Sequence, residues 1–204
     1  NGTTNSSSHK EDGLKVLIKH VDPDIICFQE VGNNPTNIDR LLTNVLNTDG
    51  ETKYNYTNYA ATSFSSLMNA TYYNTEVFEL YEQDAIERNL DNSELVRLID
   101  VITFYYKDPV LAQTLDTTFL TVFVAHLKAG NTTADRNQRA KATAALMDYI
   151  NNHPEIENFM LAGDLNVYSG STADFDNLVS SNTPDRRFYD PIQQIGNWNN
   201  NASY

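Results

Sequence analysis

Residues 119–130 read FLTVFVAHLKAG, and together with two shorter stretches they decide the fold prediction. The β-branched and aromatic residues at its start favour a buried strand over 119–125, which runs into the polar His126. The same pattern occurs earlier in Asp24–Glu30 (DIICFQE) and later in Met160–Asn166 (MLAGDLN). Polar residues at the ends of buried strands commonly share one cleft, because rigid backbone aims their side chains. The three stretches therefore predict three strands that carry one site.

The rest of the chain alternates between helical and extended patterns, with no internal repeat and no interdomain linker. This mixture predicts one α/β or α+β domain. Apolar residues at i, i+3, i+4 and i+7, such as Leu14, Leu17, Ile18 and Val21, predict helices, and β-branched apolar runs predict strands. The expected helices cover 14–21, 38–46, 136–150 and 173–179, the expected strands 25–28, 70–81, 98–106, 119–125 and 159–162, and the expected loops 1–12 and 182–204.

Composition limits what the protein can be. Of its 204 residues 40% are hydrophobic and 11% aromatic, which excludes global disorder. The formal net charge of -13 makes the chain a poor non-specific DNA coater, although a bound divalent metal can supply positive charge for phosphate chemistry. Cys27 is the single cysteine, so neither an internal disulfide nor a cysteine-based zinc site is possible. No apolar run of membrane-spanning length occurs, so no stable membrane insertion is expected.

Four polar residues are candidates for chemistry. Glu30 offers a hard oxygen ligand for Mg²⁺ or Ca²⁺, or is a surface carboxylate. With an ordinary pKa of about 6.5, His126 is suited to general acid or base catalysis, or is a structural histidine. Asp164 and Asn166 would face the same site if the chain is extended there; alternatively they form a turn in which the asparagine caps the strand.

Two further features have a structural and a functional interpretation. Trp198 either stacks on a base or a lipid headgroup or anchors a long loop. The segment 128–141 carries a local net charge of +3, which steers a polyanion or is a solvated helix face. Its charged residues are Lys128, Asp135, Arg136, Arg139 and Lys141.

The ordered set DPDIICFQEV, AHLKAG and AGDLNVY resembles the endonuclease/exonuclease/phosphatase (DNase-I-like) superfamily. The resemblance covers about residues 14–200. It is closest to bacterial exported members, which carry HLKAG, GDxNxY and a later GxWxN segment. These motifs are residues 126–130, 163–168 and 196–200 here.

The resemblance implies a four-layer α/β sandwich of two packed mixed sheets flanked by helices. It implies a divalent-metal-dependent phosphoester hydrolase, a nuclease or other phosphodiesterase for which nucleic acid is a candidate substrate. Mg²⁺ is the expected cofactor, with Mn²⁺ or Ca²⁺ as alternatives. By match to the family motifs, Glu30 binds the metal, His126 contacts the scissile phosphate and assists the leaving group, Asp164 orients or deprotonates the attacking water, and Asn166 holds a phosphate oxygen.

The sequence departs from the family pattern at both ends. The family begins with a strand that carries an asparagine and ends with a Ser-Asp-His triplet, and neither is found here. Residues 1–204 are therefore expected to form a single domain truncated at both ends and lacking its terminal strands. We expect this segment by itself to be inactive and poorly soluble.

Other functions stay open at this point. A phospholipid or sugar-phosphate esterase would use the same chemistry, and a non-catalytic extracellular binding module would keep the fold alone. A glycosidase with Glu30 and Asp164 as its carboxylate pair would leave His126 and Asn166 unexplained. Extracellular or periplasmic localisation is expected, and the composition suits it. In a chain this rich in asparagine, threonine and serine, most of the six Asn-x-Ser/Thr sequons arise by chance; they are at Asn1, Asn5, Asn55, Asn69, Asn131 and Asn201.

Overall fold

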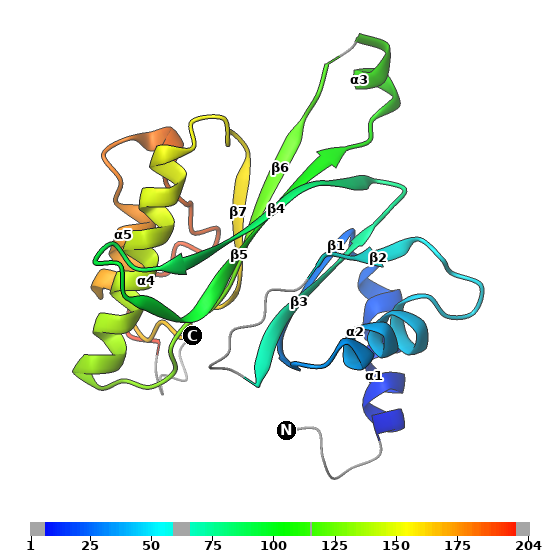
Figure 1. Cartoon of the computed structure of the whole chain (residues 1–204), viewed down its shortest axis with the longest axis horizontal. Helices are drawn as coiled ribbons and strands as arrows, with labels where there is room; N and C mark the ends of the chain where they lie inside the picture. The colour runs from blue at the N-terminus through cyan, green and yellow to red at the C-terminus, as the bar shows by residue number, and fades with distance from the viewer. Residues whose placement is uncertain (1–6, 59–65, 115, 199–204) are drawn as a thin grey trace. The chain divides into compact units, whose positions relative to one another are not determined.

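The computed structural model describes residues 7–58, 66–114 and 116–198. Two sheets and five α-helices are present in these ranges, which confirms the α/β class (Figure 1). Contacts divide the chain into two compact units, residues 1–81 with 104–118 and residues 82–103 with 119–204. The single domain and the four-layer sandwich stay predictions. No helix in the described ranges is both long and apolar enough to cross a membrane.

The first unit is built on an antiparallel sheet with the strand order β1-β3-β2. Residues of its helices, such as Ile18, Ile38 and Val45, pack with strand residues such as Ile26 and Met68 to form its core. Its elements are α1 (Ser7–Val21), β1 (Ile25–Gly32), α2 (Pro35–Leu41), a π-helical turn (Leu42–Leu46), β2 (Tyr54–Tyr56), β3 (Leu67–Asn74) and α3 (Pro109–Thr114).

Helix α1 differs from its prediction in length and in the face it buries. Residues 7–12, expected as loop, are helical. Of the four apolar residues at helical spacing, Ile18 is 9% exposed, whereas Leu17 and Val21 are 56% and 59% exposed. The four span an arc of about 100° on a helix, and the core of the unit covers only the part near Leu14 and Ile18.

The second unit carries a sheet with the strand order β4-β5-β6-β7. Strands β6 (Phe119–His126) and β7 (Phe159–Asp164) are parallel, and α4 (Thr133–Asn152) forms the crossover that parallel neighbours require. The strands expected over 119–125 and 159–162 are thus confirmed, as is the helix expected over 173–179, α5 (Ala173–Val179). The long strands β4 (Phe78–Arg88) and β5 (Glu94–Tyr106) run through both units.

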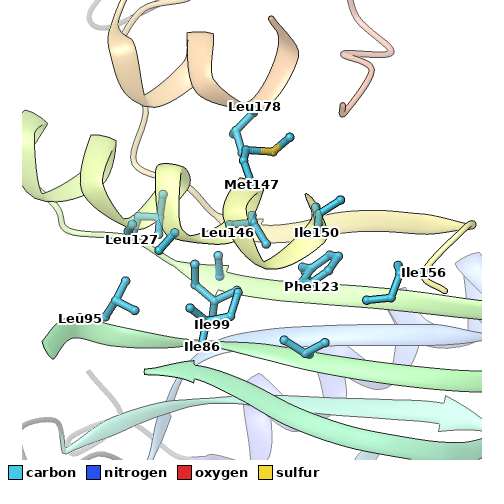
Figure 2. Packing of buried hydrophobic residues seen from close by; sticks show 14 residues of the cluster. Ile86, Leu95, Ile99, Phe123, Leu127, Leu146, Met147, Ile150, Ile156 and Leu178 are labelled. Atoms are coloured by element: carbon cyan, nitrogen blue, oxygen red, sulfur yellow. The ribbon is translucent and has the colours of Figure 1, made fainter. Parts of the chain in front are cut away.

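The core of the second unit lies between α4 and the sheet (Figure 2). Leu146 and Ile150 of α4 pack with Phe123 of β6 and Ile99 of β5, and all four side chains are at most 1% exposed. Because close packing permits little movement, this core holds β6 firmly along its length. The strand that carries His126 at its end is therefore rigidly held.

Candidate active site

His126 and Asp164 are direct neighbours across the parallel pair β6–β7. The register pairs the two residues, and the Leu127 N–H donates to the Asp164 carbonyl at 2.9 Å. His126 is 4% exposed, whereas the Asp164 side chain is 56% exposed. His126 Nε2 lies 3.9 Å from Asp164 Oδ2, so an imidazolium and this carboxylate would attract each other.

Asn166 joins the same group through a turn rather than through an extended stretch. Strand β7 ends at Asp164, and Asn166 adopts a left-handed backbone conformation with φ +50°. Its backbone N–H donates to Asp164 Oδ1 at 3.0 Å, and its side-chain Nδ2 donates to the Leu127 carbonyl at 3.1 Å. Of the two alternatives from the sequence, the turn that ends the strand is therefore the one observed, and the extended alternation is not. His126, Asp164 and Asn166 nevertheless lie together.

Gly163 makes the close approach of the two strands possible. Its φ is +127°, and a Cβ added there would lie 2.0 Å from the Ala125 carbonyl oxygen. Only glycine adopts this conformation without strain, and only glycine leaves room for the neighbouring strand. The glycine before the aspartate is thus required by the backbone.

Glu30 lies in the first unit, at a β-bulge. The register between β1 and β3 shifts between Phe28 and Val31, so one extra residue is inserted in β1. Glu30 has φ +59° and an exposed side chain. The expectation that the strand ends at Glu30 is wrong, since β1 continues to Gly32. Bulges re-aim side chains and are frequent beside active sites, and a left-handed non-glycine residue is a strained one.

An open depression of about 500 Å³ borders the Asp164 side of this group. Residues 163–168 and Trp198 line it. Trp198 is held there by an N–H donated from its indole to the Gln194 carbonyl at 2.7 Å and by edge contact with Phe175 at 5.3 Å between ring centroids. The tryptophan thus anchors its own loop and also borders the depression. Of the GNWNN segment, residues 199 and 200 lie outside the described ranges.

The segment 128–141 is not a free basic surface. Three of its four cations are paired with carboxylates: Lys128 with Asp135, Arg139 with Asp174 and Lys141 with Asp91. Hydrogen bonds from Lys128 and then from Thr132 lower the pKa of the Asp135 carboxyl to about 2. The solvated-face interpretation is wrong for Arg139, which is fully buried, and the pairing removes the basis for steering.

Sequence reasoning missed the arginines that hydrogen-bond the backbone carbonyls just after His126. Arg97 of β5 donates to the Leu127 carbonyl at 2.7 Å, the same oxygen that Asn166 contacts. Arg139 of α4 donates to the carbonyls of Lys128 and Gly130, and Tyr168 lies against its guanidinium. The sequence holds a signal only for Arg139, as a cation in a helical stretch close to His126, and that pattern is equally typical of a surface residue.

Taken together, the group offers a buried imidazole, an exposed carboxylate and an amide. Such a set can move a proton, orient a water molecule and hold an anionic oxygen. In the described ranges no three His, Cys, Asp or Glu side chains gather as a metal-binding cluster. The carboxylate of Glu30 in the first unit and that of Asp164 in the second each offer oxygen donors of the kind that Mg²⁺ prefers.

The model of the Endonuclease/Exonuclease/phosphatase family matches residues 1–202. The chain belongs to this endonuclease/exonuclease/phosphatase family. Hydrolysis of phosphoesters and use of a divalent metal are general features of the family. No curated protein sequence matches the chain significantly.

Solved structures share the fold at low sequence identity. The catalytic domain of human Nocturnin is 18% identical, with a TM-score of 0.63 over 84% of this chain and 62% of that one. A mannosyl-6-phosphatase of Bacteroides thetaiotaomicron is 14% identical, with a TM-score of 0.59 over 87% and 67%. ANGEL2, a 2',3'-cyclic phosphatase, is 19% identical, with a TM-score of 0.59 over 81% and 46%. The chain thus spans about three fifths of the Nocturnin domain.

Proposed function

We propose that the protein is a divalent-metal-dependent phosphodiesterase, with nuclease activity as its leading form. The observation that carries the proposal is the pairing of His126 with Asp164 at the ends of two parallel strands, with Asn166 turned back onto the Asp164 carboxylate and the Leu127 carbonyl. Hydrolysis of a phosphoester needs an activated water, a stabilised phosphoryl oxygen and a protonated leaving group at the same place. Family membership supports this chemistry.

Each side chain of the group has one proposed task. Asp164, whose carboxylate is exposed beside the depression, orients or deprotonates the attacking water. His126 contacts the scissile phosphate and donates a proton to the departing oxygen. Asn166 donates one side-chain N–H to the Leu127 carbonyl and directs the remaining one to a phosphate oxygen.

Glu30 is the proposed metal ligand. Its exposed carboxylate at a strained bulge suits a hard cation, and structural strain of this kind is frequent at functional residues. The metal, when bound, supplies positive charge for the phosphate in a chain whose net charge is -13.

The charge also bears on the substrate. The chain is acidic, and three of the four cations of segment 128–141 are paired with carboxylates, so the described residues offer no basic track for a long duplex. Short single strands and small diesters are therefore the expected nuclease-type substrates. A sugar-phosphate or phospholipid esterase is the alternative within the same chemistry.

The test is a substrate panel with the purified protein and Mg²⁺. The panel holds bis(p-nitrophenyl) phosphate, p-nitrophenyl phosphate, a short single-stranded oligonucleotide and a sugar phosphate. We expect a protein that contains the whole family domain to hydrolyse the diesters, and this hydrolysis to stop when EDTA is added. Because the chain spans only part of its structural neighbours, the 204-residue chain and any longer natural product that contains it are assayed side by side. Preference for the monoesters would favour the alternative, and absence of metal-dependent hydrolysis in both proteins would contradict the proposal.

A further inference from the structure

Arg139 is a fully buried arginine near the middle of α4, and its contacts lead to both loops of the candidate active site. Its Nε donates to Asp174 Oδ2 at 2.5 Å, and its Nη1 donates to the carbonyls of Lys128 at 2.9 Å and Gly130 at 2.7 Å. The guanidinium carbon lies 5.2 Å from the centre of the Tyr168 ring. Nη2 has no hydrogen-bond partner in the described ranges. A buried cation is expensive, so this arrangement needs a reason.

The two backbone segments that meet at Arg139 are those that follow the two site-bearing strands. Residues 127–130 follow His126, and residues 165–168 follow Asp164 and contain Asn166. The segments are also linked directly, because the Gly130 N–H donates to the Tyr168 hydroxyl at 3.3 Å. One guanidinium thus holds the first segment by its carbonyls and supports the second through an aromatic ring.

We propose that Arg139 is a positioning residue that sets the spacing between His126 and the Asp164–Asn166 turn. It touches no reacting atom, and its effect passes through the carbonyls of 128 and 130 and through Tyr168. The arginine donates from Nε to Asp174 and from Nη1 to two carbonyls while its guanidinium carbon lies over the Tyr168 ring. The single ammonium nitrogen of a lysine lacks the second, separately directed donor and the planar group. The effect on catalysis rests on the proposed function, whereas the effect on the two segments does not.

Arg186 provides a matched control in the same unit. Its guanidinium also binds backbone carbonyls, those of Ile150, His153 and Ile156, and lies 6.0 Å from the Phe159 ring. These contacts are at the C-terminal end of α4 and at the start of β7, whereas the candidate site lies at the other end of β7. Substitution of either arginine therefore removes hydrogen bonds from a guanidinium to backbone carbonyls. Only Arg139 lies close to the candidate active site.

The experiment compares Arg139→Lys and Tyr168→Phe with Arg186→Lys in the diester assay. The lysine keeps a cation beside Asp174 but loses the fork, and the phenylalanine keeps the ring but loses the acceptor for the Gly130 N–H. We expect Arg139→Lys to lower kcat by about 10–100-fold, because small misplacements of reacting groups are that costly, with KM changed less than about threefold. Tyr168→Phe should also lower kcat, but by a smaller factor than Arg139→Lys. Arg186→Lys should keep kcat within about twofold of wild type even where its loss of Tm equals that of Arg139→Lys.

Amide hydrogen exchange gives a second readout that needs no activity. The Leu127 N–H donates to the Asp164 carbonyl and the Gly130 N–H to the Tyr168 hydroxyl, so both leave the first segment, whereas the Asn166 N–H donates to the Asp164 carboxylate within its own turn. We expect them to exchange about tenfold faster in Arg139→Lys and unchanged in Arg186→Lys. If the wild type hydrolyses no phosphoester, the proposed function is contradicted. The exchange rates of the two variants still test whether Arg139 positions the two segments. The inference would be overturned if these N–H groups exchanged at the same rate in Arg139→Lys and Arg186→Lys. It would also be overturned if the enzyme is active and the two variants have the same kcat at the same Tm.

Discussion

Gly163 shows how one residue without a side chain determines the geometry of two others. Its φ of +127° and the 2.0 Å separation between an added Cβ and the Ala125 carbonyl mean that Gly163→Ala must push β6 and β7 apart beside His126 and Asp164. We expect a loss of about 1–3 kcal/mol in the free energy of unfolding and a larger loss in kcat. The measurement is urea unfolding together with the diester assay. Gly13→Ala, in helix α1 with no atom within 4 Å of its added Cβ, is the control and should be neutral or stabilising.

Glu30 allows a residue-level test in which stability and function move in opposite directions. Its φ of +59° is costly for glutamate and free for glycine, so Glu30→Gly should raise the free energy of unfolding by up to about 1 kcal/mol. The same change removes the proposed metal ligand, so Mn²⁺ binding followed by electron paramagnetic resonance should weaken. Glu30→Gln, which keeps the strain and removes the charge, should weaken binding without the gain in stability. Unchanged Mn²⁺ affinity in both variants would remove Glu30 from the metal site.

Among the elements, the N-terminus of α4 fixes the loop that follows β6. Thr132 and Asp135 form a capping box, and Asp135 also accepts a hydrogen bond from Lys128. The pKa of Asp135 is lowered to about 2 from 3.8, so the stabilisation is fully present above about pH 4 and is lost as the pH falls through about 2.

This element gives a prediction in pH. Wild type should lose stability between about pH 4 and pH 2 more steeply than Asp135→Asn, because the asparagine does not titrate. Urea unfolding across that range measures the difference. As a control, Thr132→Ala should cost about 1 kcal/mol at neutral pH through loss of the cap. Parallel pH curves for wild type and Asp135→Asn would show that the carboxylate carries none of the effect.

For the whole molecule, the sequence indicated the α/β class and the strands that lead to His126 and Asp164, because buried strands and helices leave strong periodic signals. It left the turn at Asn166 as one of two alternatives, and it did not indicate the bulge at Glu30 or the burial of Arg139. Each of these depends on a partner distant in sequence, such as β3 for the bulge and Asp174 for the arginine. Local patterns carry no information about such partners, so the supporting residues became visible only in the fold.

The central claim is that His126, Asp164 and Asn166 form one hydrolytic unit. Groups that act as a unit are strongly non-additive: each single loss costs about as much as the combined loss. The most direct measurement is therefore kcat/KM for Mg²⁺-dependent hydrolysis of bis(p-nitrophenyl) phosphate by His126→Ala, Asp164→Asn and the double variant. We expect each single variant to lose about 10²–10⁴-fold and the double variant to lose little more than the worse single one. Single variants that keep nearly full activity, or a double variant whose loss is the product of the two single losses, would contradict the account.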